Sequence, residues 1–307
     1  PVKTVILTFT KTGGAATDSL YISDISACNN NSTTQVWPSN YQSINTPEAG
    51  QPSFTLACYK DSIMVVNLTS NTASLLYRDP TFSSGGINSL AIDPYRQIIY
   101  YSDNTKVNTN RAIYQYNIKT GVKSTFIADV TTFGIQLFSA GLGSGAASFY
   151  NGSLFIGQDE FGYNNEPVAV YRIDIDPTTG NPIKASRFWS QQGNSSATLF
   201  SLFDWSDFVI NDGITYNFNT VTSNPNRTAV LHFDMNIMDT LVGYRDTARA
   251  QVSLDYTGAI WHMMSGKRQL YNPITGGYGP DITYSGVAGQ AILDAGESFK
   301  YPYDYGD

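Results

Sequence analysis

The feature that most constrains the fold is a short unit that recurs along the chain. In each copy a β-rich run ends at a turn of Asp, Asn, Gly or Pro, and another β-rich run follows. No long stretch carries apolar residues at helical spacing with caps at both ends, so helix-based folds are excluded. The clearest copy, Ile87 to Asp129, predicts four strands, at Ser89–Pro94, Gln97–Ser102, Ala112–Ile118 and Val122–Ala128.

Four further copies are expected along the chain. They lie at Phe54–Arg78, Ala146–Trp189, Asp207–Tyr244 and Gln251–Ser285. The turns after the third strands recur at an irregular period of roughly 40 to 60 residues, near Asn67, Asn117, Asp176, Asn236 and Asn272.

A meander of four antiparallel strands is the blade of a β-propeller. Five copies plus the chain ends predict an all-β propeller of six four-stranded blades in one domain, residues 1–299, followed by an extended Tyr-rich tail, residues 300–307. The sixth blade is expected to combine Val2–Thr10, Ser19–Ser26 and Gln290–Phe299, because closure removes exposed sheet edges. Alternatively, Val2–Thr10 inserts into a neighbouring molecule and links protomers head to tail.

One copy carries a recognisable sequence signature. The run Leu90–Pro94 followed by Ile98–Asp103 resembles the YWTD propellers of LDL-receptor-type ectodomains, and more loosely the six-bladed NHL and lactonase-like propellers. Elsewhere the tetrad departs from that pattern, to Leu154–Gly157 and Ile260–Met263. The resemblance implies a propeller and an extracellular setting, and it implies no ligand.

Charge and composition limit the classes of partner. Only 14% of residues are charged, the net charge is -7, and no Lys/Arg cluster occurs, which excludes nucleic acid. The apolar runs are strand-sized, so no transmembrane segment is expected. The chain starts at Pro1, and we expect a removed signal peptide or a trimmed end. Neutral polar residues dominate, as is typical of a secreted protein. Cys28 and Cys58 are expected to form one disulfide in an oxidising compartment, the alternative being two buried free thiols.

Catalytic signatures are absent from the sequence. No HExxH, GxSxG, P-loop or paired CxxC motif occurs. His232 and His262 lie inside expected strands, which favours structural roles. No cofactor is expected, with Ca²⁺ as the exception, because carboxylates supply its oxygen ligands. The weak candidates are Asp159 and Glu160 in a loop; Asp174 with Asp176 is interpreted as turn chemistry, and Asp204 with Asp207 is a third acidic pair.

Two kinds of surface site remain. Loop aromatic residues could stack on sugars, namely Tyr95, Tyr163, Trp205, Tyr278, Tyr301, Tyr303 and Tyr305. Sequons for N-glycosylation stand at Asn30, Asn31, Asn67, Asn151, Asn194 and Asn226. Chance alone would produce this number in a chain so rich in Asn and Ser.

The favoured function is a non-catalytic, secreted structural or adhesive propeller. Such a chain would be a glycosylated subunit that associates with itself, or with an extracellular protein or glycan, and that builds a filament through a terminal strand. The alternative is a carbohydrate- or peptide-binding receptor module, and a Ca²⁺-dependent lactonase-like hydrolase is the third hypothesis.

Overall fold

The structure of the chain is a computed structural model. All described residues belong to one compact unit, Thr34–Asp307. They are residues 52–82, 85–103, 111–136, 142, 144–158, 168–191, 207–211, 213–218, 227–232, 237–242, 251–275, 277–286 and 292–299.

Antiparallel strands form five sheets among these residues, four with four strands and one with five. The first sheet has the order β21-β1-β2-β3, with β21 (Asp294–Ala295), β1 (Phe54–Tyr59), β2 (Ser62–Asn67) and β3 (Thr72–Arg78). The second is a meander of β4 (Ile87–Asp93), β5 (Ile98–Asp103), β6 (Ile113–Asn117) and β7 (Val122–Ile127). The third is a meander of β8 (Ser144–Tyr150), β9 (Ser153–Gln158), β10 (Val168–Ile175) and β11 (Pro182–Gln191).

The last two sheets follow the same pattern. The fourth contains β12 (Asp207–Asn211), β13 (Ile214–Phe218), β14 (Arg227–His232) and β15 (Ile237–Val242). The fifth contains β16 (Val252–Leu254), β17 (Ile260–Met264), β18 (Lys267–Asn272) and β19 (Gly277–Tyr278), and β20 (Ile282–Thr283) also pairs with β18. The five sheets coincide with the five copies expected from the sequence.

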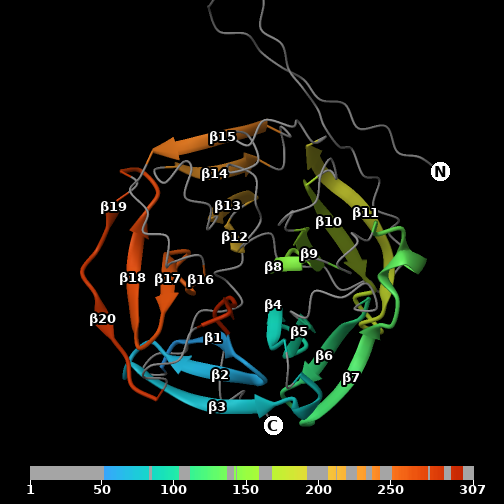
Figure 1. Cartoon of the computed structure of the whole chain (residues 1–307), viewed down its shortest axis with the longest axis horizontal. Coiled ribbons are helices and arrows are strands. Elements are labelled where there is room, and N and C mark those ends of the chain that lie inside the picture. Colours follow the sequence, from blue (N-terminus) through green and yellow to red (C-terminus); the bar gives the residue numbers. More distant parts are fainter. Residues whose placement is uncertain are drawn as a thin grey trace, which may run out of the picture. The chain divides into compact units, whose positions relative to one another are not determined.

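The sheets stand side by side around a common centre (Figure 1). Strand β4 contacts β8, β8 contacts β12, and β12 contacts β16; β16 in turn contacts β1 and β21, and these contact β4. The ring therefore closes on itself. The fold is a β-propeller. The prediction of six blades is wrong for the described part of the chain, because five sheets complete this ring.

The C-terminal segment closes the ring. Strand β21 pairs antiparallel with β1 through Ala57 with Ala295 and Cys58 with Asp294. It becomes the innermost strand of the first sheet, whose other three strands, β1 to β3, follow one another in the chain. The sequence placed Gln290–Phe299 in a sixth blade with N-terminal strands. The described residues of this segment, 292–299, instead complete the first sheet. Val2–Thr10 and Ser19–Ser26 lie outside the described residues.

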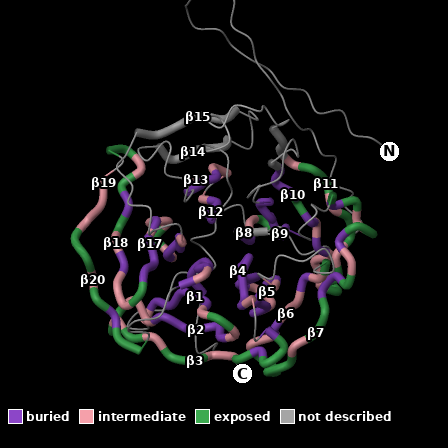
Figure 2. The backbone as a smooth tube through the Cα atoms, in the orientation of Figure 1, coloured by how far each residue is buried: buried purple, intermediate pink, exposed green. Residues whose placement is uncertain are grey.

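Apolar layers between neighbouring sheets form the core. Central strands such as β2 are buried on both faces, whereas outer strands such as β3 alternate between half-buried and exposed residues (Figure 2). One layer joins the second and third sheets through side chains such as Tyr100 and Phe149, and another joins the first and second through side chains such as Ile63 and Tyr101. Burial on both faces explains why the inner strands read as continuous apolar runs.

The third and fourth strands of four sheets are joined by one kind of turn. Asn67, Asn117, Asp176 and Asn272 each accept backbone N–H groups two or three residues ahead on their side-chain oxygen. Such Asx turns compete with strand pairing and end the strand. The turns near these four residues are confirmed, and Asn236 lies outside the described residues.

Two further sequence expectations can be compared with the structure. Cys58 is fully buried on β1, enclosed by the first two sheets, and its Sγ donates to the Ile87 carbonyl at 3.1 Å. Its expected partner Cys28 lies outside the described residues, so the disulfide between them stays a prediction. Within the described ranges, no helix has the length and apolarity needed to cross a membrane.

Candidate functional site

The C-terminal segment, residues 292–299, lies on the inner side of the first sheet, where β21 contacts the inner strands β1, β4 and β16. The inner strand of a blade has one edge without a strand partner, and its buried N–H groups need acceptors. Asp294 and Glu297 provide them, together with Asp207 at the start of β12. These three carboxyl groups are fully or almost fully buried and are called here the axial clasp.

Asp294 and Glu297 reach the second and third sheets. The Leu90 N–H of β4 donates to Asp294 Oδ2 at 2.6 Å, and the Ile92 N–H donates to Glu297 Oε2 at 3.3 Å. The Phe149 N–H of β8 donates to Glu297 Oε1 at 3.0 Å, and the Ser148 hydroxyl donates to the same oxygen. One segment thus holds the inner strands of two neighbouring blades.

The remaining sheets are held around the same axis. The Val252 N–H of β16 donates to Asp207 Oδ2 at 2.5 Å, which joins the fourth and fifth sheets. The Ser298 N–H donates to the Leu254 carbonyl at 2.8 Å, and the Thr55 hydroxyl of β1 donates to the Gly296 carbonyl at 2.7 Å. The Thr55 hydroxyl of β1 and the Ser253 hydroxyl of β16 also form a hydrogen bond with each other.

The clasp has unusual electrostatics because it contains acids without a paired base. Burial raises the pKa of Glu297 to about 7, although the Ser148 hydroxyl and backbone N–H groups oppose this shift. Burial also raises the pKa values of Asp207 and Asp294 well above the usual range, and the charge of Asp294 further raises that of Asp207. Asp207 Oδ1 accepts no N–H or hydroxyl donor. A hydrogen bond between the two carboxyl groups also raises the pKa of Asp207 and lowers that of Asp294, which favours Asp207 as the donor.

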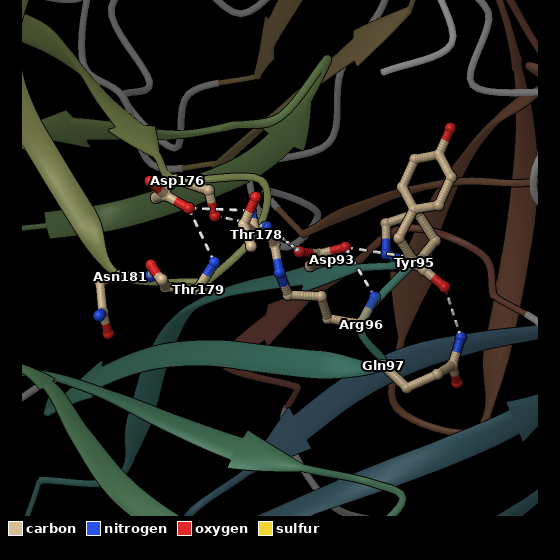
Figure 3. Close-up of polar contacts among 9 residues, drawn as sticks. Asp93, Tyr95, Arg96, Gln97, Asp176, Thr178, Thr179 and Asn181 are labelled. Atoms are coloured by element: carbon tan, nitrogen blue, oxygen red, sulfur yellow. Dashed lines mark hydrogen bonds and ion pairs between the residues drawn. The ribbon is translucent and has the colours of Figure 1, made fainter. Parts of the chain in front are cut away.

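A second polar site bridges the second and third sheets at a turn (Figure 3). Arg96, in the β4–β5 turn, bonds Asp93 Oδ2 through Nη1 at 2.6 Å and the Asp176 carbonyl through Nη2 at 2.6 Å. Asp93 Oδ1 accepts the N–H groups of Tyr95 and Arg96. Burial raises the pKa of Asp93, and the Arg96 charge counteracts this effect. The Asp-Pro turn of the signature run is thus an inter-blade contact.

The residues singled out from the sequence are not brought together. Asp176 accepts the Thr178 and Thr179 N–H groups, which confirms the turn interpretation for this residue. Asp174 instead lies inside β10 and forms ion pairs with Arg172 and Lys184. His262 is buried among Phe218, Tyr271 and Tyr278, which confirms a packed histidine. Asn67 is half-buried at the end of β2, and Asn151 is exposed.

Several candidates lie outside the described residues or have undescribed side chains. Within the described part of the chain, no group of three or more His, Cys, Asp and Glu side chains is arranged to hold a metal ion. The candidates on which the structure gives no side-chain information are Asp159, Glu160, Asp204, His232, Asn30, Asn31, Asn194, Asn226, Tyr163, Trp205, Tyr301, Tyr303 and Tyr305.

Sequence reasoning missed the axial clasp. Asp207 was noted only as a possible cation ligand, and Asp294 and Glu297 were not singled out. A signal was present, because Asp294-Ala-Gly-Glu297 places two acids on a segment flanked by apolar residues with no base nearby until Lys300.

Comparison with known proteins does not place this chain in a family. The sequence matches no family profile and no curated protein. Similar solved structures include a nidogen/laminin complex (12% identity, 81% of this chain and 98% of that chain covered, TM-score 0.49). Others are the WD40 propeller domain of Doa1 (12%, 79% and 82%, 0.41) and TolB from Acinetobacter baumannii (12%, 82% and 66%, 0.41). Values this low carry no functional argument, and the fold assignment rests on the sheets described above.

Proposed function

We propose that this chain is a non-catalytic propeller of the extracellular space that presents its surface as a structural or adhesive protein. It assembles with further copies of itself through a terminal strand, and it works without a cofactor. The observation that carries the proposal is the closure of the ring by the C-terminal segment.

The described ring closes through β21, so a strand from residues 2–10 is not needed to complete it. The sequence allows this β-rich segment two uses, in its own propeller or in a neighbouring molecule. The first is now taken by residues 292–299, which favours the second. Strand donation supplies affinity through main-chain hydrogen bonds, and a head-to-tail contact that does not close generates a filament.

The centre of the propeller supports the non-catalytic part of the proposal. Acids in a catalytic channel need free lone pairs to bind a metal or to accept a proton from substrate. Here Asp294 and Glu297 accept backbone N–H groups of β4 and β8, and both side chains are buried. Their bonds hold blades together.

Deletion of residues 1–10 tests self-assembly. We expect filaments of the full chain in electron micrographs, discrete particles of the deletion variant, and the same melting temperature for both. Deletion of residues 300–307 is the matched control and should leave filaments intact. Filaments that persist without residues 1–10 would refute strand donation, and discrete glycan-binding particles of the full chain would favour the receptor module instead.

Glycosylation is tested at the Asn67 sequon. Asn67 Oδ1 accepts the Thr69 and Ser70 N–H groups, and Thr69 is exposed. Thr69→Ala removes the sequon and keeps this turn, whereas Thr69→Ser keeps both. For the protein from its native source, we expect intact mass to fall by one glycan in Thr69→Ala and to be retained in Thr69→Ser. Equal masses, apart from the side-chain difference, would show that Asn67 carries no glycan.

A further inference from the structure

The axial clasp is the point at which the propeller is closed, and it is made of acids alone. Asp294 and Glu297 come from the closing segment, and Asp207 comes from β12, which lies earlier in the chain. None of the three forms an ion pair with a Lys, Arg or His side chain of the described residues. A buried carboxylate without a counter-charge is costly, and protonation is the least costly way to neutralise it.

The groups that face the clasp do not supply a positive charge either. Strand β1 contributes the Cys58 thiol, whose pKa is raised by burial and by the charge of Asp294. Strand β8 contributes the Ser148 hydroxyl and β16 contributes backbone of Val252. From β4 the contacts are the Leu90 and Ile92 N–H groups, since the Asp93 carboxylate is paired with Arg96.

We propose that closure of this propeller is proton-operated: the axial clasp holds residues 292–299 in the centre while its acids are protonated and weakens when they ionise. Ionisation would place negative charges side by side in a space with no counter-ion. The N–H bonds from β4 and β8 would remain, but repulsion between Asp207, Asp294 and Glu297 would act on the segment that completes the ring.

The sign of the effect follows from proton linkage. Glu297 has an ordinary pKa of 4.5 and a pKa of about 7 in the folded chain. Its stabilising contribution is therefore fully present below pH 4.5 and is lost as pH rises through 7. This single group should raise the unfolding equilibrium constant roughly 300-fold between mildly acidic and mildly alkaline solution, since each pKa unit is a factor of ten. Asp207 and Asp294 act in the same direction.

The test combines equilibrium unfolding with hydrogen exchange on the full chain. Unfolding in urea is measured from about pH 4 to 8.5, and exchange is followed in the peptide that contains residues 292–299, corrected for intrinsic exchange rates. We expect protection of this peptide to fall with rising pH before that of the β9–β10 peptides. In Glu297→Gln the pH dependence of the unfolding constant should decrease by roughly 300-fold.

Two further variants keep the test decisive if Glu297→Gln does not fold. Ser148→Ala removes a hydroxyl that lowers the pKa of Glu297, so the loss of protection should continue to higher pH and be larger in total than in the wild type. Asp129→Asn is the control, because Asp129 is a carboxyl whose pKa is lowered by the Thr131 hydroxyl and N–H groups and by Arg111. It should leave the behaviour between pH 5 and 8 unchanged.

Three results would overturn the proposal. One is protection of residues 292–299 that does not change with pH. Another is a Glu297→Gln or Ser148→Ala variant with the full wild-type pH profile. The third is a pH dependence that is abolished by millimolar CaCl₂ and restored by EDTA, since a cation would then neutralise the clasp.

Discussion

Phe299 provides the most direct measure of how strongly the closing segment holds the ring. Its side chain is 1% exposed and its ring centroid lies 6.5 Å from that of Phe54 on β1. Its N–H donates to the Phe54 carbonyl at 3.1 Å. A buried Phe→Ala substitution costs about 3–5 kcal/mol, through lost transfer free energy and the cavity that remains.

This cost can be converted into a melting temperature. In a domain of this size class 1 kcal/mol corresponds to about 2–4 °C, so Phe299→Ala should lower Tm by roughly 6–20 °C. Scanning calorimetry and urea unfolding measure the change. Ile274→Ala is the control, because Ile274 is 92% exposed and should shift Tm little. A Phe299→Ala variant within about 1 kcal/mol of wild type would show that the segment does not hold the ring as described.

Two further substitutions test contacts between neighbouring blades. Arg96→Ala leaves the Asp93 carboxylate buried and unpaired, so the free energy of unfolding in urea should fall by about 3 kcal/mol. The loss should be smaller when Asp93→Asn is already present, and equal losses in both backgrounds would contradict the inter-blade bridge. Gly286 has φ +100° and a Cβ there would lie 2.0 Å from the Ala73 carbonyl oxygen, whereas a Cβ at Gly134, with φ +82°, would meet nothing within 4 Å. Gly286→Ala should therefore lower Tm far more than Gly134→Ala, whose cost is about 1 kcal/mol, and similar losses would refute the close approach.

Local structure was predictable because its signals are local. The expected strands Gln97–Ser102 and Val122–Ala128 agree with β5 and β7 to within a residue at each end. Asx turns depend on a side chain and backbone only two or three residues apart, and the turn at Asp176 was recognised for that reason.

Closure and blade number were not predictable, because they depend on pairing between distant residues. Ala57 and Ala295 are far apart in the sequence, and no local pattern fixes the register in which they pair. One clue was available: the copy Phe54–Arg78 has room for three strands only, so one of its strands had to come from elsewhere. The clasp was not predictable for the same reason, since Asp207 and Glu297 are distant in the sequence and only the closed ring brings them to the same site.

The measurement that tests the closed ring most directly is an engineered cross-link between β1 and β21. Ala57 and Ala295 are directly opposite partners and both are buried. Directly opposite Cβ atoms lie about 4.5–5.5 Å apart, close to the separation that a disulfide spans. In a background without Cys28 and Cys58, Ala57→Cys with Ala295→Cys should form a disulfide on mild oxidation of the folded protein. Peptide mapping should recover the linked pair, while Ala57→Cys with Ile274→Cys should stay reduced. Two free thiols in the first variant would contradict closure by the C-terminal segment.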